Sequence, residues 1–426
     1  MTRFLRTALA CVVALAVTRT ARADDLTMDR AVAIALQRNR DIVAARLEIE
    51  AAQVDRITAG LYWNPQFQYA VGNVVLGAGN QEDKGLHPGP LSELVHTVGV
   101  SEVVDVWAKR NRRIRAADIG VEQRRLLVED ALREIVFAVR GAFTDLVREQ
   151  AELDLSKTMK ARYDETIRLS RARTNAGEIS AAEFRKIELE GLKYLNALID
   201  AQLELDVTRQ HLAALLGLRS EAELPGAAIP DVPPRTPPAL APLVARALEQ
   251  RPDMRAAKKG ILLADAQLSA AEREAYPDIS VGAAYTHSEF TASGDNANAL
   301  GLSVSLPLPL FDRNQGGIAR SRLERKRSDN ETKRLELVVE HEVAETVRRV
   351  EHSLALLDVY EGGMLSRADD ALRVAESSYK AGAVSLLELL EAQRTYIETR
   401  ADYLKVQDDY RKARIDVTRA VGEGTP

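Results

Sequence analysis

The sequence has little cysteine, few aromatic residues and no net positive charge, and each of these features argues against a class of protein. Cys11 is the only cysteine among the 426 residues, and aromatic residues make up 5%. A single cysteine excludes a framework of disulfide bonds within the chain. An aromatic content of 5% is low for a soluble protein with an aromatic-rich core. The formal net charge of −5 gives no electrostatic support for a nucleic-acid partner. Beyond the N-terminus we find no apolar run of about 18 residues, so a transporter made of membrane-spanning helices is excluded.

Motifs for catalysis and metal binding are also missing. We find no glycine-rich phosphate loop and no nucleophile motif, so we expect no enzyme, no catalytic residue and no cofactor. The histidines are scattered, and neighbours such as His341 and Glu342 point to different sides of a predicted helix. We therefore expect surface histidines and no metal site. The six histidines are His87, His96, His211, His287, His341 and His352.

Residues 1–23 have the pattern of a signal peptide. Basic residues precede an apolar segment at 7–17, and Ala21-Arg22-Ala23 gives the small-x-small cleavage pattern. We expect export from the cytoplasm and a mature chain that begins at Asp24. A short membrane anchor and lipidation of Cys11 are the alternatives. The anchor is disfavoured by its length, and lipidation by the apolar run that continues past Cys11.

The rest of the chain consists of two internal sequence repeats. Alanine, leucine, arginine and glutamate dominate and favour long helices, and short motifs recur in the same order in both halves. We predict a first repeat at 24–220, a proline-rich linker at 221–238 and a second repeat at 239–426. The matching motifs are Asn39-Arg40-Asp41 with Arg251-Pro252-Asp253, Pro65 with Pro277, Val100-Ser101 with Val304-Ser305, Trp107 with Phe311, Ala176–Ser180 with Ala381–Ser385, and Leu216-Gly217 with Val421-Gly422.

Each repeat reads as a helix, two strands and two long helices. Helical spacing over 28–61 and 240–275 stops at Pro65 and Pro277. The strands are about ten residues each, which is the length of a tilted transmembrane β-strand. A soluble hairpin is the alternative. The apolar positions that mark the predicted strands fall within 67–71, 98–106, 279–285 and 300–308, and loops at 77–89 and 293–298 join the two strands of each repeat.

The helices after the strands are very long. Residues 114–171 contain no proline and would extend about 87 Å. The next helix covers 180–217, and the second half repeats the design at 322–380 and 385–421. In the last helix Leu389, Tyr396, Tyr403, Tyr410 and Val417 recur every seven residues, and Phe184, Gly191, Leu198, Leu205 and Leu212 do so in the first half. A strict heptad indicates a left-handed supercoil, and a plain two-stranded coiled coil is the alternative.

Four strands leave two open edges in each chain. Every backbone donor and acceptor in a membrane must be paired, so a membrane sheet has to close by oligomerisation. Two copies give eight strands, which side chains usually fill, whereas three copies give twelve strands and a lumen. The predicted fold class is therefore mainly α with a transmembrane β-barrel, in which a trimer forms a 12-stranded β-barrel on a periplasmic α-helical barrel.

Several segments resemble one family. The tip Tyr379–Ser385 (YKAGAVS) with LLELLEAQ after it, the opening LTMDRAV and the segment LPLPLFDRNQGG resemble TolC-type outer-membrane efflux proteins, most of all the heavy-metal branch related to CzcC. The resemblance implies a passive trimeric duct in the outer membrane of a Gram-negative bacterium. Its implied partners are outer-membrane lipid, a periplasmic adaptor and an inner-membrane pump of the resistance–nodulation–division type. Heavy-metal cations are the implied substrate.

The alternatives are an outer-membrane duct for drugs or organic compounds or for type I secretion and, in a different class, a periplasmic coiled-coil scaffold or adaptor. The resemblance also assigns adaptor docking to the two tips. Glycine allows the tight reversal there, and Ser180 and Ser385 can cap the following helices. These residues could instead serve only the turns. The docking residues are Ala176, Gly177, Glu178, Ile179, Ser180, Ala381, Gly382, Ala383, Val384 and Ser385. Acidic residues after the tips would form entrance rings under threefold symmetry, or lie on solvated flanks: Glu183, Glu188, Glu388 and Glu391.

Overall fold

A computed structural model describes residues 26–73, 94–225, 227–230, 233–288 and 297–423. The predicted signal peptide at 1–23, the loop at 77–89 and most of the loop at 293–298 lie outside the described residues. The chain divides into two compact units. The hairpin unit comprises Met1–Asn39, Val136–Arg235 and His352–Lys412, and the strand unit comprises Arg40–Ile135, Thr236–Glu351 and Ala413–Pro426.

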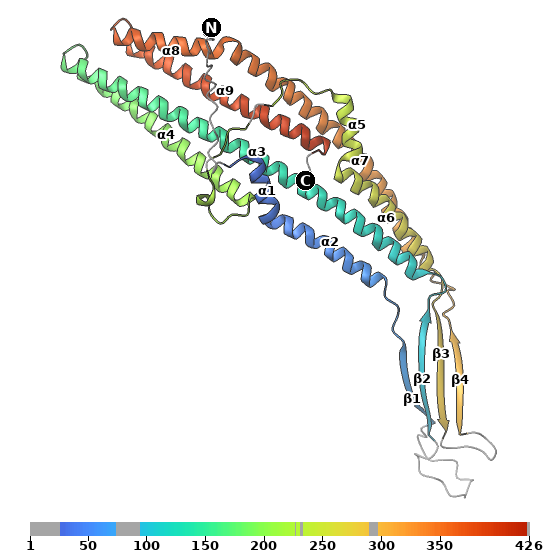
Figure 1. Ribbon diagram of the computed structural model, residues 1–426. Helices are drawn as coiled ribbons and strands as arrows, with labels where there is room; N and C mark the ends of the chain where they lie inside the picture. Colours follow the sequence, from blue (N-terminus) through green and yellow to red (C-terminus); the bar gives the residue numbers. More distant parts are fainter. Residues whose placement is uncertain (1–25, 74–93, 226, 231–232, 289–296, 424–426) are drawn as a thin grey trace, which may run out of the picture. The chain divides into compact units, whose positions relative to one another are not determined.

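The strand unit contains one antiparallel sheet in the order β1-β2-β3-β4 (Figure 1). The strands are β1 (Gln66–Gly72), β2 (Val95–Val104), β3 (Ile279–Ser288) and β4 (Asn298–Ser305). The predicted strands are confirmed with shifted ends. The central pair joins the two halves of the chain, since Val98 of β2 lies opposite Tyr285 of β3.

The helix predicted before each strand pair is broken in two. The first is α1 (Met28–Arg38) and α2 (Arg40–Ala59), and the second is α5 (Leu240–Gln250) and α6 (Pro252–Glu274). The expectation of single helices over 28–61 and 240–275 was wrong. Pro252 disfavours the α conformation in the residue before it, and Arg251 has ψ 129°. Asn39 also leaves the α conformation, at ψ 127°, and its side-chain amide donates to the carbonyl of Leu215 at 2.8 Å.

The long helices α3 (Lys109–Asn175), α4 (Ala181–Leu215) and α9 (Leu386–Val421) confirm the predicted ones, and a short 3₁₀ turn (Glu221–Glu223) follows α4. The helix predicted at 322–380 was wrong as one piece. It is α7 (Gln315–Val359), a π-helical turn (Tyr360–Met364) and α8 (Leu365–Lys380). The π turn accommodates Gly363, whose φ of 136° no α-helix allows. Among the described residues, no helix is both long and apolar enough to cross a bilayer.

Within the hairpin unit, apolar residues at helical spacing form the core. Met159 of α3, Ala368 and Leu372 of α8 and Tyr396 of α9 pack into one buried cluster. The rings of Tyr163 and Tyr194 stack at 4.5 Å between α3 and α4. The heptad positions of α4 and α9 are all buried or half-buried, so the seven-residue pattern identified the inward faces.

Candidate functional site: paired helical tips and a two-faced sheet

Two turns in the hairpin unit reverse the chain in the same way. Gly177 between α3 and α4 has φ +79°, and Gly382 between α8 and α9 has φ +74°. The amide of Glu178 donates to the carbonyl of Arg173 at 2.9 Å, and the amide of Ala383 donates to the carbonyl of Ser378 at 2.8 Å. This bond pattern closes a helix end around a left-handed glycine. The two tips are therefore one structural motif used twice.

Serine begins the next helix at both tips, as predicted. Ser180 accepts the amide of Glu183 at 3.2 Å, while the Glu183 carboxylate accepts the amide of Ser180 at 3.0 Å. This is a capping box. Ser385 accepts the amide of Glu388 at 3.3 Å. The reciprocal bonds that Ser180 makes with the carboxylate lower the pKa of Glu183.

The ends of the two tips are exposed. Ile179 and Val384 are half-buried, whereas the glycines and the residues beside them face solvent. Arg173 connects the tips, since it donates to the Glu178 carboxylate at 2.9 Å and to the carbonyl of Tyr379 at 3.4 Å. The structure thus brings the two predicted docking segments together, although 200 residues of sequence separate them.

The four acidic candidates lie in different environments. Glu183 is engaged in its capping box, and Glu188 pairs with Arg171 at 3.2 Å. Glu388 is exposed on α9. Glu391 lines a groove of about 510 Å³ between α4 and α9. Two of the four are therefore already paired within the chain, and their arrangement as rings stays a prediction.

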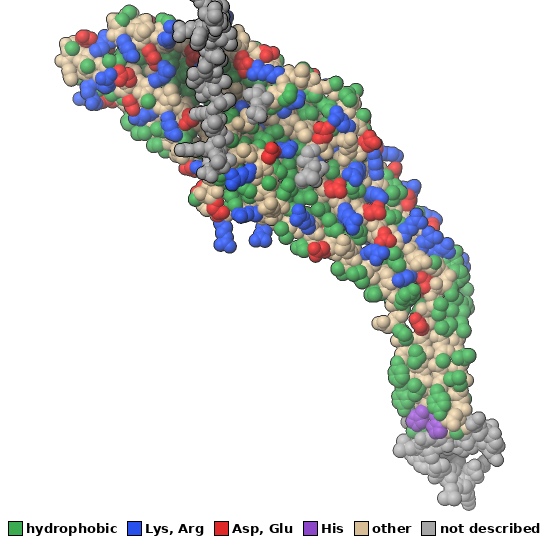
Figure 2. All heavy atoms as spheres, in the orientation of Figure 1, with side chains coloured by type: hydrophobic (Ala, Val, Ile, Leu, Met, Phe, Trp, Pro, Cys, Tyr) green, Lys and Arg blue, Asp and Glu red, His purple; other side chains and the backbone are tan. Residues whose placement is uncertain are grey.

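The sheet of the strand unit has two different faces. One side is apolar apart from Glu102 near the helices and a polar row at the opposite end, and its large apolar side chains are at least 40% exposed, except the half-buried Ile279 beside the helices. Figure 2 shows mainly hydrophobic side chains over the strands on the face in view. The apolar side carries Phe67, Tyr69, Val71, Val98, Val100, Val281, Tyr285, Leu300, Leu302 and Val304. The other side carries mainly small and polar residues, with Val95 and Val103 as its larger apolar members: Gln66, Gln68, Ala70, Thr97, Gly99, Ser101, Ser280, Gly282, Ala284, Thr286, Gly301, Ser303 and Ser305.

Aromatic residues mark both ends of the sheet. At the helix end the rings of Trp107 and Tyr276 stack at 4.9 Å, and the Trp107 indole donates to the carbonyl of Pro277 at 2.9 Å. Toward the other end Tyr69 and Tyr285 lie on the apolar face next to the polar row, and their hydroxyls contact His96 and Asn298. Amphipathic aromatic rings at the two borders of an apolar band are typical of membrane-spanning strands.

The far end of the sheet also brings two histidines together, which the sequence analysis missed. His96 lies directly opposite His287 across β2 and β3. His96 Nδ1 is 2.9 Å from the Tyr69 hydroxyl, and His287 Nδ1 is 2.9 Å from Asn298 Oδ1. Histidine side chains gather at this end in Figure 2. Within the described residues, no group of three or more potential metal ligands is found.

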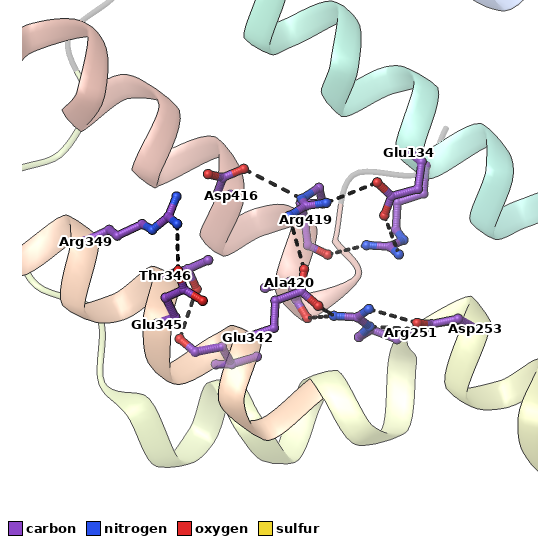
Figure 3. A network of polar contacts seen from close by, with 12 residues as sticks. Glu134, Arg251, Asp253, Glu342, Glu345, Thr346, Arg349, Asp416, Arg419 and Ala420 are labelled. Atoms are coloured by element: carbon purple, nitrogen blue, oxygen red, sulfur yellow. Dashed lines mark hydrogen bonds and ion pairs between the residues drawn. The ribbon is translucent and has the colours of Figure 1, made fainter. Parts of the chain in front are cut away.

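An ionic network surrounds the buried Arg251 where helices of the strand unit end (Figure 3). Arg251 is 4% exposed and donates to Asp253 at 2.8 Å, to Glu342 at 2.7 Å and to the carbonyl of Ala420 at 3.1 Å. Arg419 contacts Glu342 at 3.1 Å and Glu134 at 3.2 Å. The Arg251-Pro252-Asp253 motif, which matches Asn39-Arg40-Asp41 in the first half, was a signal for this site, but sequence alone did not reveal its partners.

The fold and these sites define a class of protein before any comparison. An open sheet with one apolar face, joined to long helices that end in paired turns, fits a membrane conduit. The Outer membrane efflux protein family matches residues 31–218 and 243–423. The chain belongs to this family of outer-membrane efflux channels, which are not enzymes. It resides in the outer membrane of a Gram-negative bacterium, with its helical part in the periplasm.

Two curated relatives span most of the chain. Nodulation protein T of Rhizobium leguminosarum bv. viciae is 26% identical over 389 residues, covering 88% of this chain and 78% of the relative. Cobalt-zinc-cadmium resistance protein CzcC of Cupriavidus metallidurans is 24% identical, covering 89% of this chain and 85% of the relative.

Solved structures show the same fold. CusC has a TM-score of 0.77 at 19% identity, covering 94% of this chain and 93% of its own. The outer membrane protein VceC of Vibrio cholerae has a TM-score of 0.74 at 18% identity, covering 94% of this chain and 97% of its own.

Proposed function

We propose that the protein is the passive exit duct of a tripartite efflux system and that three copies close a 12-stranded barrel. The two-faced sheet carries this proposal. An apolar face with exposed side chains such as Leu302 (83% exposed) is unfavourable in water and favourable against lipid. The small and polar face suits an aqueous lumen.

Closure by neighbouring copies follows from the edges of the sheet. In the described part of the chain, the outer edges of β1 and β4 pair with no other strand. Unpaired backbone groups are not tolerated in lipid, so each edge needs a strand from another copy. On this proposal the chain consists of a signal peptide (1–23), two repeats (24–220 and 239–426) and a linker (221–238).

Exposed apolar residues on α4 support the helical part of the same assembly. Leu192, Ile199 and Leu203 recur at helical spacing and are each more than half exposed. A second copy would cover this stripe as three helical units form a periplasmic barrel. A soluble scaffold or adaptor would bury the stripe as well, but it would leave the apolar face of the sheet in water.

Heavy-metal cations are the proposed substrate, delivered by a periplasmic adaptor and an inner-membrane pump of the resistance–nodulation–division type. The relative named Cobalt-zinc-cadmium resistance protein CzcC supports this choice. A duct for organic compounds is the second candidate, and the Toluene efflux pump outer membrane protein TtgF of Pseudomonas putida, which is 26% identical to this chain, supports it. Because the pump and the adaptor would select the cargo, the duct itself needs no metal site.

Two measurements test the duct. Membrane fractionation with a heat-modifiable trimer assay should place the protein in the outer membrane as a trimer, whereas a soluble monomer would support the scaffold. A deletion strain should lose tolerance to cobalt, zinc or cadmium and regain it with the wild-type gene. Loss of tolerance to organic compounds alone would support the second candidate.

The two tips are the proposed adaptor-docking surface. Their support is exposure and proximity, since Ala176–Glu178 and Ala381–Ala383 are exposed and Arg173 bridges the two turns. Glu388 and Glu391 are the proposed entrance rings that favour cations. Glu388→Gln and Glu391→Gln should reduce cation selectivity in single-channel recordings, and unchanged conductance and selectivity would refute the rings.

A further inference from the structure

The second long hairpin has a break that the first does not have. The π turn at Tyr360–Met364 separates α7 from α8 and contains Gly362 and Gly363. The amide of Leu365 reaches back to the carbonyl of Tyr360, and Gly363 adopts φ 136° and ψ −8°. Bulges of this kind and adjacent glycines are the usual causes of sharp kinks in helices.

The matching position of the first hairpin is regular. Counting back from the tip glycines, Gly363 corresponds to Thr158, which lies inside the unbroken α3. The Thr158 hydroxyl donates to the carbonyl of Asp154 at 2.8 Å, the residue one turn earlier. The two halves share their tips but differ here, so the break is a specific feature of the second half.

Glu361, inside the π turn, is held by the linker. The guanidinium of Arg235 donates to both carboxylate oxygens of Glu361, at 2.6 Å and 2.9 Å. The Tyr403 hydroxyl of α9 donates to Glu361 at 3.0 Å. A bidentate pair of this kind fixes orientation as well as distance. The π turn is therefore tied to both the linker and α9.

The linker is itself anchored next to this contact. Tyr410 of α9 donates its hydroxyl to the carbonyl of Pro234 at 2.5 Å. Two consecutive prolines, Pro233 and Pro234, precede Arg235 and stiffen the backbone there. Arg235 thus reaches Glu361 from a fixed base.

We propose that Tyr360–Met364 is a hinge between α7 and α8, and that the Arg235–Glu361 contact is the latch that holds it in its present bend. The proposal rests on the proposed function for its consequence, since α8 leads directly to the tip at Ala381–Ser385. Release of the latch lets this tip move relative to the first tip, whose α3 has no hinge. The duct entrance then changes width through one hairpin of each subunit.

Spin labels across the hinge test the mechanism directly. In a Cys11→Ser background of the full chain, Ala355→Cys on α7 and Ala371→Cys on α8 place labels on exposed sites, with backbone positions about 24 Å apart in a straight helix. Glu361→Gln should broaden or shift this distance distribution by at least about one residue rise, ~1.5 Å. Labels at Asp154 and Arg168 of α3 serve as the matched pair and should not change.

Two variants keep the test sharp. Arg235→Lys retains the positive charge but loses the two-pronged contact, so it should broaden the same distribution if Glu361→Gln fails to fold. Glu398→Gln removes an exposed pair with Arg394 within α9 and should leave both distributions unchanged. Unchanged distances in the latch variants, or equal broadening in both hairpins, would overturn the hinge and latch.

Conductance in planar lipid bilayers tests the consequence. Glu361→Gln should spend a several-fold larger fraction of time in the wider conductance state than the wild type. A shifted distance distribution with unchanged conductance would refute the role of the hinge at the entrance. A wild-type protein that forms no pore would refute the proposed duct, but it would leave the distance result on the hinge standing.

Discussion

Leu302 and Ser303 are neighbours in β4 and offer a direct test of the two-faced sheet. Leu302 is 83% exposed on the apolar face, and it lies in the cross-strand row of Phe67, Val100 and Ala283 near the middle of the sheet. Ser303 lies on the small, polar face. An arginine on the lipid side of a membrane barrel costs about 2–4 kcal/mol at mid-depth, whereas one facing the lumen costs little.

We therefore expect Leu302→Arg to destabilise the membrane-inserted protein by about 2–4 kcal/mol per subunit. Ser303→Arg introduces the same side chain one residue away, and it should change stability by about 0.5 kcal/mol or less. Urea unfolding in lipid vesicles gives the free energies, and the heat-modifiable trimer on gels reports assembly. Equal effects of both variants, or a larger effect of Ser303→Arg, would refute the assignment of the apolar face to lipid.

Three further predictions concern the helical parts. Gly217 has φ +69°, and a Cβ at this position would lie 2.5 Å from the Arg38 carbonyl oxygen. At Gly177 a Cβ would meet open space, so Gly177→Ala carries only the cost of placing alanine in a left-handed backbone conformation, about 1–2 kcal/mol. Gly217→Ala should therefore lower the thermal unfolding temperature far more than Gly177→Ala. Arg251→Ala removes a buried guanidinium and the direct partner of the half-buried Asp253, whereas Glu342 keeps its contact with Arg419, so we expect a cost of about 1–3 kcal/mol in urea unfolding. The half-exposed Arg255→Ala should cost about 0–1 kcal/mol, and similar values for both variants would contradict the role of Arg251. Burial alone raises the pKa of Asp253, but hydrogen bonds and the charges of Arg251 and Arg133 lower it overall, so its stabilisation is present at neutral pH and is lost as the pH falls through the lowered pKa. The unfolding free energy should therefore fall below about pH 4 in the wild type and less steeply in Asp253→Asn.

The tips could be predicted almost residue by residue because local chemistry determines them. Glycine is the residue that readily adopts the positive φ found at Gly177 and Gly382, and serine is a preferred cap. The strands could also be located, since alternation and stop signals are local. The pairing of the strands could not be predicted from local signals, because β2 and β3 are neighbours in the sheet but lie far apart in the sequence.

The helix breaks were missed because their causes are partly non-local. Asn39 lies within a continuous helical pattern, and its departure is stabilised by a carbonyl that comes more than 170 residues later. Pro252 was a visible signal, but proline is also common in the first turn of a helix and does not by itself reveal a bend. The π turn carried a local signal in Gly362-Gly363, which the prediction of one helix over 322–380 did not use.

The same closure occurs in both halves of the chain and explains why the breaks are there. Gly217 follows α4 and lies against Arg38, at the break between α1 and α2, while Gly422 follows α9 and lies against Arg251, at the break between α5 and α6. In each case the residue at the break donates to a carbonyl in the last turn of the long helix, Leu215 or Ala420. A straight first helix would carry that donor past the carbonyl and bring a side chain toward the glycine. The break therefore lets the first helical segment of each half pack against the end of the last long helix of the same half. This contact gives a physical reason why the motifs at the two ends of each half recur together. They are Asn39-Arg40-Asp41 with Leu216-Gly217, and Arg251-Pro252-Asp253 with Val421-Gly422.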